Sequence, residues 1–190
     1  MKYPRIRRIP TTDWEVRHMY DLSDYEVEVL LSAPVYVEEK LDGKITQMTI
    51  WEGQGLKLPC RELVLFGEDL HWVHTVEYDS IPMLSSYIIY FDIYDGYNKV
   101  WYPPEARNPI LRDHGLIPPP LIYTGNVSIA GLLSMMDRRS EFGSSKIEGI
   151  VIKRYDGDRL IAGKIINPEF EGRMGRWLRR PRRMNSNVGN

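Results

Sequence analysis

The stretch VYVEEKLDG, residues 35–43, places a lysine between a β-rich run and a glycine turn. Residues 35–39 alternate in the manner of a strand, and Val and Tyr are frequent in strands. Gly43 can adopt a positive φ, so the LDG segment is expected to turn the chain into a second strand over residues 44–51. Lys40 therefore stands at the end of a strand, immediately before a tight turn.

The rest of the chain predicts a mixed fold. Further strand patterns are short β-rich runs bounded by turn residues, and they cover residues 62–66, 87–94, 97–102, 149–154 and 159–166. Helical patterns, bounded by capping or turn residues, cover residues 105–114, 128–138 and 168–178. Strands and helices alternate irregularly, which argues against a doubly wound parallel sheet. We therefore expect an α+β fold built on antiparallel or mixed sheets.

Length and composition suit one globular domain. The chain has 190 residues, of which 43% are hydrophobic and 27% charged, and a chain of this size buries roughly 70% of its surface on folding. Cys60 is the sole cysteine, which excludes an intrachain disulfide and argues against structural zinc. This cysteine content fits a reducing compartment, so we expect a cytoplasmic protein. Residues 1–10 lack the apolar run of a signal peptide, and no stretch approaches the roughly 20 apolar residues of a membrane span.

A net charge of −1 hides a basic segment near the C-terminus. Residues 173–183 carry six arginines and no acidic residue, so the remainder is acidic on balance. Such a segment can hold a phosphate backbone, or it can be a solvated and partly disordered end. We therefore divide the chain into a domain over residues 1–178 and a basic tail over residues 179–190.

Lys40 is the candidate nucleophile. An ordinary lysine has a pKa of about 10.4, which leaves roughly one in a few thousand uncharged at pH 7. Burial and nearby cations lower the pKa of a lysine and expose the amine lone pair. A lysine held beside a glycine turn is well placed to meet a phosphate. By itself, the four-residue K-x-D-G pattern is weak and is more typical of a surface hairpin with a solvated lysine.

Further motifs follow Lys40 in a fixed order along the chain. They are FGEDL at residues 66–70 with His74, Tyr78 and Pro82 behind it, YFDIYD at 90–95, EGIVIK at 148–153 and KIINPEF at 164–170. Together with KLDG, their order and spacing resemble the covalent nucleotidyltransferase superfamily of DNA ligases, RNA ligases and mRNA capping enzymes. The resemblance is closest to the RNA ligases and covers about residues 35–177. It implies an adenylation domain of two packed antiparallel or mixed sheets with flanking helices.

The resemblance implies an ATP-dependent RNA ligase that uses Mg²⁺ or Mn²⁺ and acts in RNA repair. Lys40 would attack the α-phosphate of ATP and become linked to AMP through a phosphoramidate. Glu148 would bind the divalent cation directly or through water, and Lys164 would contact the α-phosphate. AMP would then pass to an RNA 5′-phosphate, and an RNA 3′-hydroxyl would expel it.

The same resemblance assigns the nucleotide-binding residues. Glu38 would contact the adenine amino group, and Phe91 would stack on the adenine ring. Glu68 would accept hydrogen bonds from the ribose hydroxyls, which a carboxylate does well. Asp42 and Gly43 would complete the turn under the phosphate.

Two positions depart from the pattern of the family. Arg61 is the sole arginine between the second strand and the FGE motif, and it is a candidate nucleotide-binding residue or a surface charge. The last motif often has a second basic residue two positions from its lysine, where this chain has Ala162 and Ile166. Lys153 and Arg154 are the candidates for that missing charge.

The expected partner is RNA with a 5′-phosphate and a 3′-hydroxyl end. We expect no OB-fold, the domain that most DNA ligases and capping enzymes append, after the last motif, and this expectation argues against a minimal DNA ligase adenylation domain or a guanylyltransferase. A non-catalytic RNA-binding relic is the third alternative. The RNA could be bound by the arginine-rich tail. A helper protein or a further domain in trans is the other candidate for binding the RNA.

Overall fold

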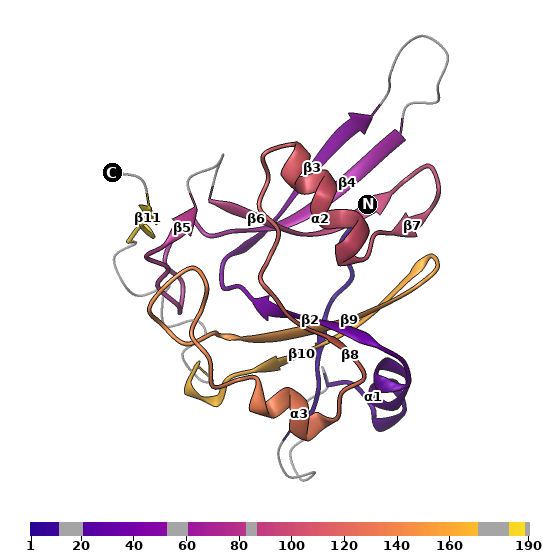
Figure 1. The fold of residues 1–190 in the computed structure, drawn as a ribbon, viewed down its shortest axis with the longest axis vertical. Helices are drawn as coiled ribbons and strands as arrows, with labels where there is room; N and C mark the ends of the chain where they lie inside the picture. Colours follow the sequence, from indigo (N-terminus) through magenta and orange to yellow (C-terminus); the bar gives the residue numbers. More distant parts are fainter. Residues whose placement is uncertain (12–20, 53–60, 83–86, 171–182, 189–190) are drawn as a thin grey trace.

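The computed structural model describes residues 1–11, 21–52, 61–82, 87–170 and 183–188. Within these residues the fold is α+β, as expected, with two larger sheets, a small two-stranded sheet and short helices (Figure 1). None of the helices in the described part of the chain combines the length and the hydropathy needed to cross a membrane.

The first sheet carries the predicted nucleophile. Its strands, in spatial order, are β1 (Arg7–Arg8), β10 (Arg159–Ile166), β9 (Gly149–Asp156), β2 (Val35–Lys40) and β8 (Leu121–Gly125). All neighbours are antiparallel except β1, which runs parallel to β10. The predicted turn between β9 and β10 is confirmed, and Gly157 has the positive φ of 62° that such a turn requires.

The second larger sheet is antiparallel throughout. Its strands follow the order β3 (Lys44–Glu52), β4 (Arg61–Asp69), β6 (Ile88–Asp95) and β7 (Val100–Trp101). The first two form a long hairpin that extends away from the rest of the molecule (Figure 1). The predicted strand over residues 97–102 is shorter in the structure, because Tyr97 and Asn98 instead donate backbone hydrogen bonds to the Asp95 carboxylate and form a turn.

Part of the segment assigned to a basic tail packs against the domain. Strand β11 (Asn187–Val188) pairs with β5 (Ile81–Pro82) in parallel orientation. Asn185 is 3% exposed. Its side-chain Nδ2 donates to the Leu70 carbonyl at 2.6 Å, and its side-chain Oδ1 accepts from the backbone N–H of Tyr78 at 2.9 Å. These bonds hold residues 183–188 against the side of the fold.

The helices flank the sheets. Helix α1 (Asp24–Leu31) was not among the predicted helices. It begins with a capping box between Ser23 and Glu26, which is a local signal in the sequence. Helix α2 (Pro104–Asp113) matches the predicted segment, and Gly115 follows it with φ of 67°.

Helix α3 (Ile129–Ser134) is capped by Ser128 but is shorter than the predicted 128–138. It stops early because the chain turns back, with Arg139 pairing with Lys146 in an isolated bridge. In the third predicted helix, 168–178, the structure has a 3-10 turn at Pro168–Phe170, and residues 171–178 lie outside the described part.

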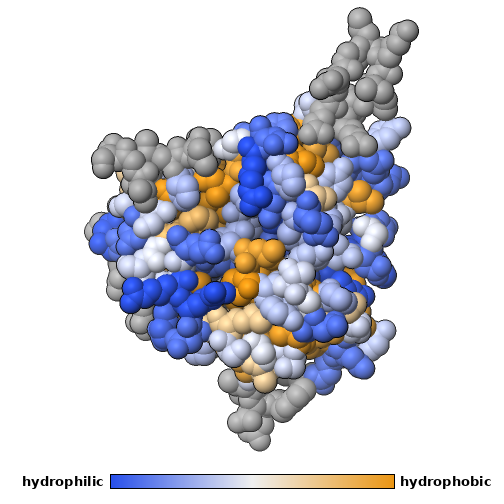
Figure 2. Space-filling view, viewed as in Figure 1, coloured by the Kyte–Doolittle hydropathy of each residue, from blue (hydrophilic) through white to orange (hydrophobic). Residues whose placement is uncertain are grey.

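The buried apolar residues of the described segments form several clusters, two of which pack the larger sheets against helices. The first sheet buries one face against α1 and α3, through residues such as Leu30, Val37, Leu132 and Ile152. The second sheet packs against α2, where Leu111 meets the buried side chains of β4 and β6. On the face shown in Figure 2, hydrophobic residues form small patches among hydrophilic ones.

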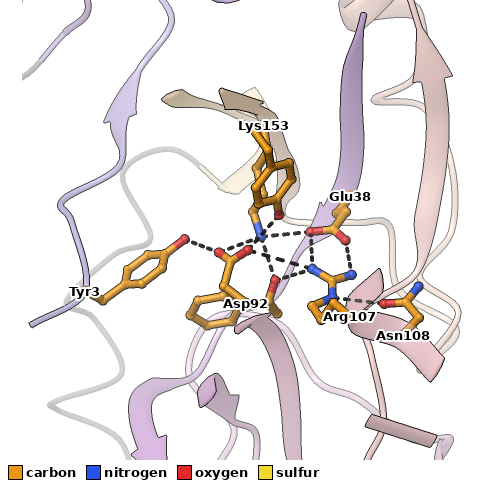
Figure 3. Close-up of polar contacts among 8 residues, drawn as sticks. Tyr3, Glu38, Asp92, Arg107, Asn108 and Lys153 are labelled. Carbon is orange, nitrogen blue, oxygen red and sulfur yellow. Dashed lines mark hydrogen bonds and ion pairs between the residues drawn. The ribbon is translucent and has the colours of Figure 1, made fainter. Parts of the chain in front are cut away.

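A cluster of buried charges joins the two larger sheets (Figure 3). Lys153 of β9 lies 2.9 Å from Glu38 of β2 and 2.9 Å from Asp92 of β6. Arg107 of α2 pairs with Glu38 and lies 3.9 Å from Asp92. The Lys153 side chain is 2% exposed, and the other three side chains are at most 1% exposed. Two anions and two cations thus link both sheets and one helix within the core.

Replacing Lys153 with methionine tests this link. The Lys153→Met variant keeps the apolar stem but leaves Glu38 and Asp92 buried opposite Arg107 alone. Breaking a buried pair from one side typically costs about 3–5 kcal/mol, so we expect a loss of this size in the free energy of unfolding. Denaturant unfolding followed by circular dichroism gives the value.

The matched control is Arg159→Met, which breaks an ion pair with Asp156 on the surface. Because exposed pairs contribute about 0–1 kcal/mol, this variant should stay close to wild type. Equal losses in the two variants would show that the buried cluster does not hold the sheets together.

Candidate active site

A cavity of about 160 Å³ is lined by residues of both larger sheets. Its walls include five of the residues that the sequence motifs single out: Glu38, Lys40, Glu68, Phe91 and Lys164. They come from β2, β4, β6 and β10, which are far apart in the sequence. The fold therefore brings the separate motifs together at one place.

Lys40 is the last residue of β2, and its ammonium forms an ion pair with Glu148, which directly precedes β9. Lys40 is paired in the sheet with Gly149. A Cβ atom at Gly149 would lie 2.2 Å from the Ile165 carbonyl oxygen, so this position accepts only glycine. The glycine lets β10 approach closely and holds Glu148 beside Lys40.

The turn after Lys40 is fixed by hydrogen bonds. The Asp42 carboxylate accepts from the backbone amides of Thr75 and Val76, the latter at 2.8 Å. The Gly43 amide donates to Glu68 at 3.0 Å, and a Cβ atom at Gly43 would lie 2.3 Å from the Asp69 carbonyl oxygen. Asp42 and Gly43 thus shape the turn and connect it to β4.

Carboxylates gather around Lys40. Burial raises the pKa of Glu68 to about 7, although the Lys40 charge and the Gly43 amide oppose the rise. Burial also raises the pKa of Glu148, against the opposing effect of Lys40. The negative charge of Asp42 adds to both increases. Such carboxyl groups gain stability from an added cation.

Lys164 lies on β10, opposite Val151 of β9. Burial lowers its pKa, and the positive charges of Lys40, Arg8 and Arg5 lower it further, while Glu148 acts in the opposite direction. Lys164 and Lys40 are therefore close enough to repel each other, as two groups that share one anionic ligand would be.

Glu38 and Phe91 form the part of the cavity next to the buried charge cluster. Burial by itself raises the pKa of Glu38, but the charges of Arg107 and Lys153 outweigh it and hold the pKa below its ordinary value. The Phe91 ring contacts the Tyr3 ring edge-on at 5.0 Å, and Lys153 Nζ lies 5.2 Å from its centroid. Phe91 lines the cavity, whereas its neighbour Asp92 is fully buried in the cluster.

The sequence model of the RNA ligase family matches residues 51–166, more than half of the chain. The protein belongs to the RNA ligase family. The matched segment contains Glu68, Phe91, Glu148 and Lys164 and begins after Lys40. A comparison with curated proteins gave no match for this RNA ligase family member.

Solved structures share its fold. Two point mutants of Naegleria gruberi RNA ligase with ATP and Mn superpose with a TM-score of 0.51 at 21% and 20% identity, over 77% of this chain and 53% of theirs. A putative ATP-dependent DNA ligase from Aquifex aeolicus superposes with a TM-score of 0.50 at 18% identity, over 87% of this chain and 49% of its own. The RNA ligase family member thus spans about half the length of the structures it matches.

Several side chains of this region are not indicated by the sequence motifs, among them Tyr3, Ile6 and Arg107. Tyr3 and Ile6 line the cavity, and Arg107 anchors Glu38 from α2. Nothing in the local sequence separates these residues from other aromatic, apolar or basic ones. Arg61, the predicted nucleotide-binding arginine, opens β4, and its side chain lies outside the described residues.

The donor groups fit one mode of metal binding. Among the described residues, no group of three or more His, Cys, Asp or Glu side chains is arranged to hold a metal ion. Mg²⁺ is commonly bound by one or two carboxylates together with substrate phosphates. Glu148, buried with a raised pKa, is a suitable carboxylate for that mode in this RNA ligase family member.

The raised pKa of Glu68 predicts a pH-dependent stability. Between pH 4.5 and about 7 the unfolded chain loses the Glu68 proton while the folded protein retains it, so stability falls as the pH rises through this window. We expect Glu68→Gln to remove about 1–3 kcal/mol of the decrease between pH 5 and pH 8. Burial raises the pKa of Glu39 to about 7 and also raises that of Glu148, so both groups leave a smaller decrease of stability with pH in the wild type and in the variant.

Denaturant unfolding at pH 5 and pH 8 measures the difference. The exposed Glu28→Gln on α1 serves as the control and should follow the wild-type slope. An unchanged slope in Glu68→Gln would contradict the assigned burial effect.

Proposed function

We propose that this protein is an ATP-dependent RNA ligase that forms a covalent lysyl-AMP at Lys40. One observation carries the proposal: Lys40, Glu68, Phe91 and Lys164 line one cavity, with Glu148 bound to Lys40 at its edge. Family membership supports a ligase activity. The similarity to ATP- and Mn-bound RNA ligases supports ATP and a divalent cation as cosubstrate and cofactor.

In the first step the Lys40 amine attacks the α-phosphorus of ATP. The N–P bond forms as the bond to pyrophosphate breaks, and the lysine nitrogen gives up two protons overall. The amine must leave its ion pair with Glu148 before it can attack. Lys164, beside Lys40, offsets the negative charge of the α-phosphate that repels the nucleophile.

A divalent cation held by Glu148 and the phosphates would compete with Lys40 for this carboxylate and would neutralise charge on the leaving group. The residues of the chain supply the rest of the site. The backbone of Glu148 is held in place, which positions its carboxylate. The Glu148 backbone carbonyl accepts from the backbone N–H of Asn167 at 2.8 Å.

The nucleoside is held by residues of both larger sheets. Phe91 presents a half-buried ring for stacking on adenine. Glu68 accepts hydrogen bonds from the ribose hydroxyls while Gly43 fixes its orientation. Glu38 Oε2 already faces Arg107 and Lys153, whereas Oε1 accepts from Arg107 alone and keeps a second lone pair for the adenine amino group.

The later steps transfer the activated AMP. The 5′-phosphate of an RNA strand attacks the phosphorus of lysyl-AMP, which breaks the N–P bond and restores the Lys40 amine. A 3′-hydroxyl then attacks the activated 5′-phosphate, forms the phosphodiester and releases AMP. The phosphoramidate keeps the free energy of ATP available between the steps.

Self-labelling tests the nucleophile. Protein incubated with α-labelled ATP and Mg²⁺ or Mn²⁺, then denatured, should retain the label, and Lys40→Ala should lose it. Lys44→Ala changes an exposed lysine four residues away and should label like wild type. Label from GTP in place of ATP would indicate capping chemistry, and a folded wild-type protein without label would refute the proposal. Nicked RNA and DNA duplexes and single-stranded RNA then identify the strand that is sealed.

Glu148→Ala tests the metal-binding carboxylate. We expect loss of labelling at every Mg²⁺ or Mn²⁺ concentration, because the carboxylate that would hold the cation beside the phosphates is removed. Glu141→Ala, which removes an exposed carboxylate from the preceding loop, is the control and should label normally. Normal labelling in a folded Glu148→Ala protein would refute the metal role.

A further inference from the structure

Strand β1 extends the floor of the cavity beyond Lys164. Arg8 pairs with Lys164, Lys164 pairs with Val151, and Val151 pairs with Glu38. Residues that lie directly opposite one another in a sheet present their side chains on the same face. The last three of these four line the cavity, and Arg8 continues the row on the same face of the sheet, next to the lining residues.

The neighbours of Arg8 on β1 confirm the face. Ile6, two residues earlier and on the same side of the extended chain, lines the cavity. Arg7, between them, points to the other side and forms an ion pair with Glu26 of α1. Because neighbouring strands lie about 4.8 Å apart, the Arg8 backbone is one strand spacing beyond that of Lys164.

The backbone around Arg8 is held at several points. The Ile9 amide donates to the Lys164 carbonyl at 2.8 Å, and the Leu22 amide donates to the Arg8 carbonyl at 2.7 Å. At the other end of the segment, the Tyr3 hydroxyl donates to Asp92 at 2.5 Å (Figure 3). The segment is therefore a fixed wall of the cavity and places Arg8 in a defined position.

Positive charge accumulates on this side of the cavity. The pKa of Lys164 is lowered first by burial and then by the charges of Lys40, Arg8 and Arg5, which places all three within electrostatic reach. Like charges held together gain free energy when an anion binds between them. Guanidinium groups suit phosphate in particular, because their N–H donors match its oxygens in pairs.

We infer that Arg8, assisted by Arg5, binds the phosphate group next to the one held by Lys164. Arg8 supplies the second basic group that is absent at Ala162 and Ile166. The inference rests on the proposed function for the origin of this phosphate, which is either the β- and γ-phosphates of ATP or the 5′-phosphate of RNA. The two sources act in different steps of the reaction, so separate assays distinguish them.

The decisive comparison is Arg8→Ala against Arg7→Ala. The two variants remove the same side chain from adjacent positions of one strand, on opposite faces of the sheet. The first assay measures kcat/KM for ATP in self-labelling. The second isolates labelled protein and follows transfer of AMP to 5′-phosphorylated RNA in the absence of ATP.

We expect Arg8→Ala to lower one of these rates by about tenfold or more, since charge-assisted hydrogen bonds contribute about 1.5–3 kcal/mol. Arg7→Ala should stay within about twofold of wild type, and Arg8→Lys should recover part of the loss because it restores the charge. A defect in self-labelling identifies the ATP phosphates, and a defect confined to transfer identifies the RNA phosphate. Equal rates in Arg8→Ala and Arg7→Ala, both near wild type, would overturn the inference.

A binding measurement separates this inference from the proposed function. Inorganic tripolyphosphate should raise the unfolding temperature of the wild type and of Arg7→Ala but not that of Arg8→Ala or of Arg8→Gln. If the wild type does not label but this pattern is found, the phosphate site stands and the ligase proposal fails. If the wild type labels and tripolyphosphate stabilises all four proteins equally, with unchanged rates, the ligase proposal stands and the role of Arg8 is refuted.

Discussion

The structure depends on a cluster of buried ion pairs that links its two larger sheets. Glu38 and Asp92 bring two negative charges into the core, and Arg107 and Lys153 bring two positive ones. An uncompensated charge is very unfavourable in such an environment, so each side chain can stay buried only while the others keep their positions. Apolar packing brings the sheets together, and this cluster defines how β2, β6, β9 and α2 are aligned.

The alignment positions the reactive groups. Glu38 lies two residues before Lys40 on β2, so the two side chains point to the same face of the strand. Phe91 directly precedes Asp92, and its carbonyl accepts a hydrogen bond from Lys153 at 2.8 Å while its ring faces the cavity. Holding the charge cluster in place therefore holds the candidate nucleophile and the candidate stacking ring on walls from different sheets.

The cavity itself is electrostatically costly for the free protein. Burial raises the pKa of Glu68 and Glu148 and lowers that of Lys164, which means that each charged form is less stable there than in water. Shifts of this kind are frequent in active sites, where a ligand compensates for the charges that the protein cannot balance alone. A metal–nucleotide complex carries both signs of charge, so it would stabilise the charged forms of the two carboxyl groups and of the lysine.

The sequence by itself determined what depends on neighbours along the chain. The turn at Gly157 follows from local residue types, and the order of the motifs was sufficient to indicate the fold class and the candidate site residues. The turn after Lys40 was also expected, but Gly43 does not have a positive φ; glycine is required there because a Cβ atom would meet the Asp69 carbonyl oxygen. Only the tertiary structure decided the partners of Tyr3, Arg107 and Arg8. Tyr3 meets Asp92 across 89 positions and Arg107 meets Glu38 across 69. No local pattern encodes such contacts, because strand register and packing between sheets decide which distant side chains meet.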